Sequence, residues 1–178
     1  MSGHSKWANI KRGKAINDAK KSQAFSKLSR LITIAAKQGG GDPDANPTLR
    51  LALEKAREAR MPKENIDKAI KKGAGGAGDG VELHEVIYEG YGPHGEAFYI
   101  KGITDNKNRT VAEIRTIFSK FGGNLGSAGS TAYIFGTDPE NPSFEIEVDE
   151  TSKESLLKLI DELDSQDDVQ DIYFNFDL

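Results

Sequence analysis

Several residue types and patterns are missing from this 178-residue chain, and each absence excludes a class of protein. There is no cysteine, which excludes disulfide frameworks, zinc–thiolate sites, iron–sulfur clusters and cysteine nucleophiles. No run approaches the roughly 20 apolar residues that a membrane span needs, and the N-terminus lacks the apolar core of a signal peptide. We therefore expect a cytoplasmic protein with no membrane partner.

Acidic residues are scarce at the start of the chain. Residues 1–37 hold nine Lys and Arg but a single acid, Asp18. The formal net charge of −4 hides this asymmetry, because residues 1–72 carry a net +10 and residues 73–178 a net −14. A basic half joined to an acidic half indicates two regions with different partners, and the basic region favours a polyanion.

Glycine is concentrated between residues 73 and 80, where it occupies five of eight positions. Such a segment has few side chains to pack, so we predict a Gly-rich linker at 73–80 between a basic helical domain, 1–72, and an acidic α+β domain, 81–178. Its Gly-x-Gly-x-x-Gly spacing also occurs in dinucleotide-binding proteins, but there it follows a strand and opens a helix. Here a helix pattern precedes it and a strand pattern follows, so we expect no nucleotide cofactor.

Helical patterns dominate the first domain. Apolar residues recur at helical spacing over residues 25–35, before a glycine triplet. Asn46-Pro47 predicts an N-cap followed by proline at the first helical position. Met61-Pro62 precedes a third helix that ends at Gly73. The sequence predicts a small three-helix domain, with residues 1–14 as a loosely held arm.

The second domain alternates strand and helix patterns. Strands are predicted over residues 83–89, 97–104, 131–135, 144–148 and 169–176. Two capping boxes, Thr110–Glu113 and Thr151–Glu154, predict the starts of two helices. The order ββαββαβ predicts an α+β fold overall, in which the N-terminal three-helix domain is followed by an α/β sandwich with a mainly antiparallel sheet.

The strongest chemical pattern is the distribution of cations before residue 38. Four cations lie in the arm around Trp7, and four more fall within about 100° of arc on a helical wheel, opposite the apolar stripe. An exposed cationic face suits phosphates, since each contact releases condensed counterions, and Trp7 suits base stacking. The predicted nucleic-acid-binding residues are Lys6, Trp7, Lys11, Arg12, Lys14, Lys20, Lys27, Arg30 and Lys37. Two alternatives stay open: the face is ordinary solvated helix surface, and Trp7 anchors the arm to the helical domain.

A polar segment between a predicted strand and a predicted helix is a second candidate. Amides exposed at a helix N-terminus favour anions. We therefore predict a secondary contact loop, for phosphate or a ribosomal surface, at Asn106, Lys107, Asn108 and Arg109. The alternative is a loop whose Asn and Asp side chains cap the local backbone.

Patterns for catalysis and metal binding are missing. The three histidines have no ligand-like spacing, and no serine lies in a nucleophile motif. The acids Asp164, Asp167, Asp168 and Asp171 are interpreted as a solvated helix end and turn. We expect no catalytic residues, no metal and no cofactor, and hence no enzyme.

Beyond these local patterns, the chain resembles the YebC/PmpR family. The similarity includes the segments Gly3–Asn9, Met61–Ile66, Tyr88–Pro93, Asp105–Val111 and Phe121–Gly126. The resemblance implies a helical N-terminal domain joined to α/β domains, without catalytic activity. It also implies either a DNA-binding transcriptional regulator or a ribosome-associated factor that helps translation of difficult stretches.

One departure from that family is visible. Its members carry a further α/β domain after the segment that matches Thr131–Phe135, whereas here residues 136–143 lead almost directly to the closing elements. The inserted domain is therefore expected to be missing near 136–143.

The combined prediction is a non-enzymatic, two-domain regulator of gene expression that binds nucleic acid. The expected partner is DNA, in transcription control. The alternative is rRNA or tRNA on the ribosome, and a second alternative is a protein–protein adaptor. The sequence leaves the oligomeric state and any target sequence open.

Overall fold

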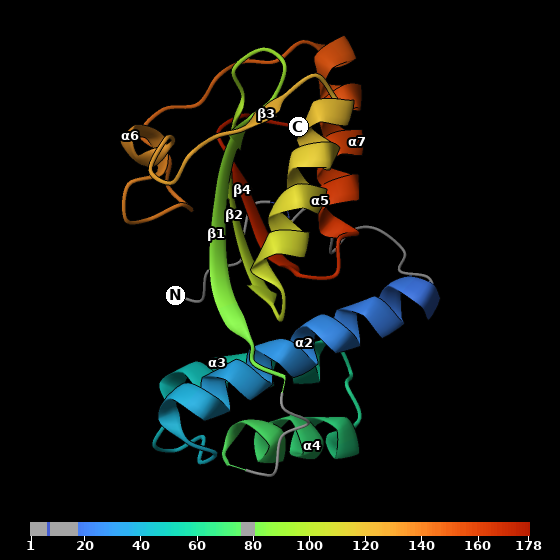
Figure 1. The fold of residues 1–178 in the computed structure, drawn as a ribbon, viewed down its shortest axis with the longest axis vertical. Helices are drawn as coiled ribbons and strands as arrows, with labels where there is room; N and C mark the ends of the chain where they lie inside the picture. Colours follow the sequence, from blue (N-terminus) through green and yellow to red (C-terminus); the bar gives the residue numbers. More distant parts are fainter. Residues whose placement is uncertain (1–6, 8–17, 76–80) are drawn as a thin grey trace. The chain divides into compact units, whose positions relative to one another are not determined.

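The computed structural model of the chain describes Trp7, residues 18–75 and residues 81–178 (Figure 1). These residues cluster into two compact units. The helical unit comprises residues 18–75 and 81–84, and the α+β unit comprises Trp7 with residues 85–178. Most of the predicted arm and linker lies outside the described residues, so the predicted domain boundaries stay a prediction.

The helical unit consists of three helices, as predicted: α2 (Asp18–Gly39), α3 (Pro47–Glu58) and α4 (Lys63–Gly73). Helix α2 packs against both of the others. Small side chains at the contacts let the helices approach closely. The shared core consists of Ile32, Ala35, Ala36, Leu49, Ala52, Leu53, Ala56, Met61 and Ala69.

One buried side chain, Asn46, joins the end of α2 to the start of α3. Its Oδ1 accepts a hydrogen bond from the Leu49 amide at 3.1 Å, which makes it the N-cap of α3, with Pro47 at the first helical position. Its Nδ2 donates to the carbonyl oxygens of Ala35 and Gly40, at 2.9 and 2.8 Å. The predicted N-cap is thus confirmed, and it also satisfies carbonyl groups at the end of the preceding helix.

The α+β unit contains an antiparallel sheet with strand order β3-β1-β2-β4. Its strands are β1 (His84–Tyr91), β2 (Ala97–Thr104), β3 (Asn124–Leu125) and β4 (Val169–Phe174). Its helices are α5 (Lys107–Lys120), α6 (Ala132–Phe135) and α7 (Glu150–Asp164). The predicted α+β class and antiparallel sheet are confirmed.

The sheet separates two apolar clusters. Helices α5 and α7 cover one face, and the short α6 lies by the opposite face (Figure 1). Phe98, Phe118, Phe174 and Phe176 dominate the larger cluster, under α5 and α7, which also contains Trp7. The smaller cluster, under α6, consists of Ala97, Ile134, Phe135 and Tyr173, with Tyr91 and Tyr99 against it.

Two predicted strands are wrong. Residues 132–135 form helix α6, because the buried Glu89 carboxylate accepts hydrogen bonds from the Gly129 and Thr131 amides and from the Thr131 hydroxyl, which turns the backbone there. Residues 144–148 make only a single bridge, between Ile146 and Phe176. The two-residue β3 pairs with β1 instead, and it is too short to give a period-2 pattern.

Helices α5 and α7 begin before the predicted capping boxes. Helix α5 starts at Lys107, because Asn106 Oδ1 accepts from the Arg109 amide at 3.1 Å. Helix α7 starts at Glu150, because Asp149 Oδ1 accepts from the Ser152 amide at 2.7 Å. Asn and Asp compete well with Thr as N-caps. None of the helices in the described ranges combines the length and apolar character needed to cross a membrane.

Candidate nucleic-acid interface

The predicted cations of α2 do not all face solvent. Lys20 and Lys37 are exposed and Arg30 is partly exposed. Lys37 Nζ lies 3.9 Å from Glu82 Oε1, a long and solvent-exposed ion pair. Lys27, in contrast, retains 9% of its surface. The expectation that Lys27 lies on an exposed face is therefore wrong.

The physical reason is that a helical wheel gives only the direction of a side chain. It places Lys27 opposite the apolar stripe, but it does not show whether another part of the chain covers that direction. The four methylene groups of a lysine can be buried at little cost when the ammonium group keeps polar contacts. The arm cations Lys6, Lys11, Arg12 and Lys14 lie outside the described residues.

A second group of cations lies on α3 and α4 and was not among the predicted residues. These side chains are exposed, and none forms an ion pair with another residue in the described part of the chain. They are Arg50, Arg57, Arg60, Lys63 and Lys71. The net charge of +10 over residues 1–72 indicates further cations in this region. The prediction named only those before residue 38, because their density is higher there.

The turn between α3 and α4 brings three of these cations together. Arg60 adopts a left-handed conformation with φ of 58°, and the Met61 amide donates to the Ala56 carbonyl at 2.9 Å. This closes α3 and buries Met61, while Arg57, Arg60 and Lys63 stay exposed around one tight turn. We name these three residues the α3–α4 corner.

Arg109, in the predicted secondary contact loop, is held by two carboxylates. Its Nη2 lies 2.7 Å from Asp105 Oδ1 and 3.0 Å from Asp168 Oδ2. Hydrogen bonds to Asp168 and then to Asp105 raise the pKa of the guanidinium above its ordinary value. Arg109 therefore shapes the loop although it is exposed. The other exposed residues of the loop are Asn106, Lys107 and Asn108.

Asp168 is the centre of a buried polar network beneath this loop. Its carboxylate, fully buried, accepts from Thr110 Oγ1 at 2.6 Å and from Gln166 Nε2 at 3.1 Å, besides Arg109. Thr110 Oγ1 also lies 2.7 Å from Thr104 Oγ1. The interpretation of Asp168 as a solvated turn residue is therefore wrong. Its partners are up to 59 residues away in the chain, and no local pattern reveals them.

Trp7 is buried in the core of the α+β unit, with 3% of its surface exposed. A ring buried to this degree offers no face on which a base could stack. The second alternative, an anchor, describes it better, but the anchor belongs to the α+β unit and not to the helical unit as predicted. The sequence places Trp7 next to the helical domain, and its contacts are with residues far away in the chain, which no local pattern reveals.

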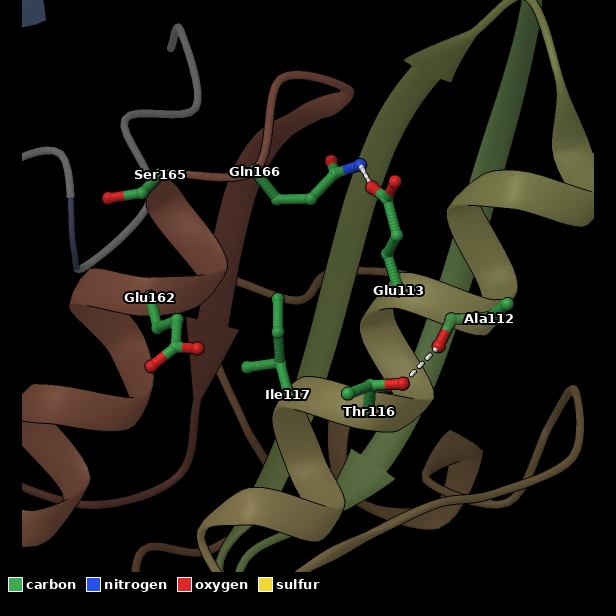
Figure 2. A pocket seen from close by; sticks show the side chains of 7 residues that line it. All are labelled: Ala112, Glu113, Thr116, Ile117, Glu162, Ser165 and Gln166. Atoms are coloured by element: carbon green, nitrogen blue, oxygen red, sulfur yellow. Dashed lines mark hydrogen bonds between the residues drawn. The ribbon is translucent and has the colours of Figure 1, made fainter.

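A cavity of about 470 Å³ lies between α5 and α7. Figure 2 shows Gln166 reaching across it toward Glu113, to which its Nε2 donates at 2.7 Å. The other carboxylate, Glu162, accepts from Lys120 at 2.8 Å. Both carboxylates that line the cavity thus already bind a side chain of the protein. Among the described residues, no group of three His, Asp or Glu side chains is placed to hold a metal ion.

Sequence models of a known family match most of the chain. The model described as "TACO1/YebC protein N-terminal domain" matches residues 5–76, and the model described as "TACO1/YebC second and third domain" matches residues 83–138. A crystal structure of a conserved hypothetical protein, Aq1575, from Aquifex aeolicus is similar in fold. It has a TM-score of 0.85 and 35% identity, and the match covers 97% of each chain.

Similar curated proteins carry the name "Probable transcriptional regulatory protein". The one from Dictyoglomus thermophilum is 44% identical over 241 positions, which cover 100% of this chain and 96% of that protein. The one from Treponema denticola is 51% identical over 167 positions, covering 94% of this chain and 66% of that protein. An alignment of 241 positions exceeds the 178 residues of this chain, so the first relative has residues without a counterpart here. Their expected location near 136–143 stays a prediction.

Proposed function

Since the chain belongs to the TACO1/YebC family, we propose that it is a non-enzymatic, cytoplasmic regulator of gene expression that acts by binding nucleic acid. Transcription control through duplex DNA is the first candidate, in line with the names of its relatives. The helical unit supplies the cationic surface. The loop with Lys107 and Asn108 adds a secondary contact that Arg109 holds in position.

The observation that carries this proposal is the set of exposed, unpaired cations on the helical unit. A lysine or arginine already paired with a carboxylate must lose that partner before it binds phosphate. The α3–α4 corner has no such partner within the described ranges. Three cations around one tight turn suit a phosphate backbone, which presents closely spaced charges. We therefore propose that the main phosphate contacts lie at the α3–α4 corner, with the exposed cations of α2 as a second candidate face.

The proposal is tested with the full chain, a labelled duplex DNA and fluorescence anisotropy between 50 and 200 mM salt. Six or more phosphate contacts should lower the affinity by about 10³–10⁵-fold across this range. The triple variant R57Q/R60Q/K63Q should bind more weakly, and the slope of log K against log salt should fall by roughly 2–3 units. The variant K20Q/R30Q/K37Q tests the α2 face in the same way.

The matched control removes three cations from the acidic unit. Lys120, Lys153 and Lys158 each already pair with a glutamate, at 2.8, 3.1 and 2.8 Å. The variant K120Q/K153Q/K158Q has the same net charge as each test variant, so it isolates location from total charge. Equal effects in control and test variants would mean that the protein has no defined phosphate-binding face. Binding that is insensitive to salt would instead favour the adaptor function.

The choice between DNA and RNA needs a second measurement, because counterion release is common to both. We propose ribosome co-sedimentation from cell lysate, with wild-type chain and R57Q/R60Q/K63Q side by side. Sedimentation with ribosomes that the variant loses would assign the same surface to rRNA or tRNA. Absence from the ribosome, together with salt-dependent duplex binding, would support the transcriptional function.

A further inference from the structure

The α+β unit carries a pair of exposed aromatic rings that the proposed function does not use. Tyr133 on α6 is 64% exposed and Phe144 is 46% exposed. Their ring centroids lie 6.1 Å apart with an angle of 36° between the planes. We name these two residues the aromatic patch. Ile87 and Val81 are comparably exposed, but their side chains are aliphatic and offer no ring face.

The aromatic patch is held in place by the structure beneath it. On α6, Ile134 and Phe135 point into the small core cluster, so Tyr133 is directed outward. The Ser143 amide donates to the Ile134 carbonyl at 2.7 Å, which fixes the residue before Phe144 against α6. Both rings are therefore pre-positioned, and a partner that binds them pays little ordering entropy.

The chain segment that contains Phe144 carries charges of one sign. Residues 138–147 contain four acids and no Lys or Arg, and all four acids are exposed. Burial and then the charge of Asp171 raise the pKa of Tyr173, in the cluster below the patch. The charges of Glu140 and Asp138 contribute to the same rise. This negative field repels phosphates, so a single-stranded nucleic acid does not suit these rings. A second copy of the chain would bring like charges together.

The same cluster already holds a cation against a ring. Lys101 Nζ lies 5.5 Å from the centroid of the Tyr173 ring, within the usual range for a cation–π contact. Exposed rings in an acidic segment offer an arginine or lysine of a partner the same contact, with carboxylates of that segment for the charge. We propose that the aromatic patch is a docking site for a Lys/Arg-rich segment of another protein.

The test uses the full chain and a labelled twelve-residue peptide of alternating Arg and Ser, with a Gly/Ser peptide of equal length as reference. Anisotropy measured at 50 mM salt should show binding of the Arg peptide only. The variant Y133S/F144S leaves the net charge unchanged, so a loss of affinity of about tenfold or more reports the rings themselves. The variant E145Q/E147Q should weaken binding and reduce its salt dependence.

The matched control is I87S, which removes a comparably exposed apolar side chain from β1 and should bind the Arg peptide as wild type does. If Y133S/F144S is poorly folded by circular dichroism, the ring resonances of Tyr133 in the wild-type chain supply the readout. They should shift on addition of the Arg peptide.

Four outcomes would overturn the proposal. The first is equal peptide affinity in wild type and Y133S/F144S, and the second is no shift of the Tyr133 resonances on addition of the Arg peptide. The third is a dimer in sedimentation velocity that Y133S/F144S abolishes. The fourth is loss of duplex DNA binding in Y133S/F144S. The first two would mean that the aromatic patch binds no cationic segment. The last two would assign it to a second copy or to nucleic acid. Because DNA binding is measured separately, failure here leaves the proposed function intact.

Discussion

Replacing Asp168 by alanine is the sharpest test of how the α+β unit holds the loop before α5. Asp168 is fully buried and accepts hydrogen bonds from Arg109, Thr110 and Gln166. A hydrogen bond to a charged group contributes about 1.5–3 kcal/mol. Arg109, Thr110 and Gln166 each keep another hydrogen-bond partner in D168A, so the loss of free energy is smaller than the sum of the three bonds. We expect D168A to lower the free energy of unfolding of this unit by about 3 kcal/mol.

The control is D105A, because Asp105 binds the same guanidinium from the surface. Its side chain is about one-third exposed, and it lies 2.7 Å from Arg109 Nη2. Exposed ion pairs contribute roughly 0–1 kcal/mol. The two variants thus remove the same kind of contact from the same arginine, and they differ in burial.

The assay uses urea unfolding followed by tryptophan fluorescence. Trp7 is the single tryptophan and is buried in the core of the α+β unit, so its emission reports that unit alone. With a slope near 1 kcal/mol per molar urea, D168A should lower the midpoint by about 3 M, and D105A by less than about 1 M. Equal shifts in the two variants would refute the argument that the buried network, and not the surface ion pair, fixes the loop.

Two further predictions concern a cap and the tyrosines. N46A should lower the stability of the helical unit by about 2 kcal/mol, because α3 loses its N-cap and two carbonyls lose a donor. N46D keeps the acceptor and should lose less stability. In N46A the unfolding transition followed by circular dichroism at 222 nm should change, while the transition followed by Trp7 fluorescence should not. Burial, and then Tyr133 beside it, raises the pKa of Tyr91 to about 12, and burial also raises the pKa of Tyr99. The folded state then keeps protons that the unfolded chain releases near pH 10, so stability is present below pH 10 and is lost as the pH rises toward 12. Unfolding of the α+β unit at pH 8, 10 and 11.5 checks this, and Y91F should reduce the loss; a stability that is constant over this range would contradict it.

Elements with local signals were predictable from the sequence. The strand over residues 97–104 was predicted with the bounds that β2 has, because a Gly-rich turn precedes it and β-branched and aromatic residues fill it. Asn46-Pro47 marked the start of α3 in the same way. In both cases the neighbours in the chain determine the structure.

Elements that depend on distant partners were not predictable. Residues 131–135 have the composition of a strand, yet Glu89, some 40 residues earlier, turns their backbone into α6. Asp168 looks like its solvated acidic neighbours until Thr110 and Arg109 are placed beside it. Trp7 is far from the α+β unit in the sequence and is buried in its core. Each error concerns a contact between residues far apart, which periodicity and capping rules do not contain.

The charge asymmetry that pointed to a polyanion also changes its meaning in the structure. The net −14 of residues 73–178 is not all surface charge, since Glu89, Glu96 and Asp168 are buried and bind amides, hydroxyls or a side chain of their own unit. These carboxylates hold turns in place. Four exposed acids lie instead within residues 138–147, in the segment that contains Phe144 of the aromatic patch. Under the two proposals, a phosphate backbone would bind unpaired cations on the helical unit, and a cationic protein segment would bind acids and rings on the α+β unit. The two proposed surfaces have opposite sign and share no residue, so we expect that neither partner competes for the other's residues.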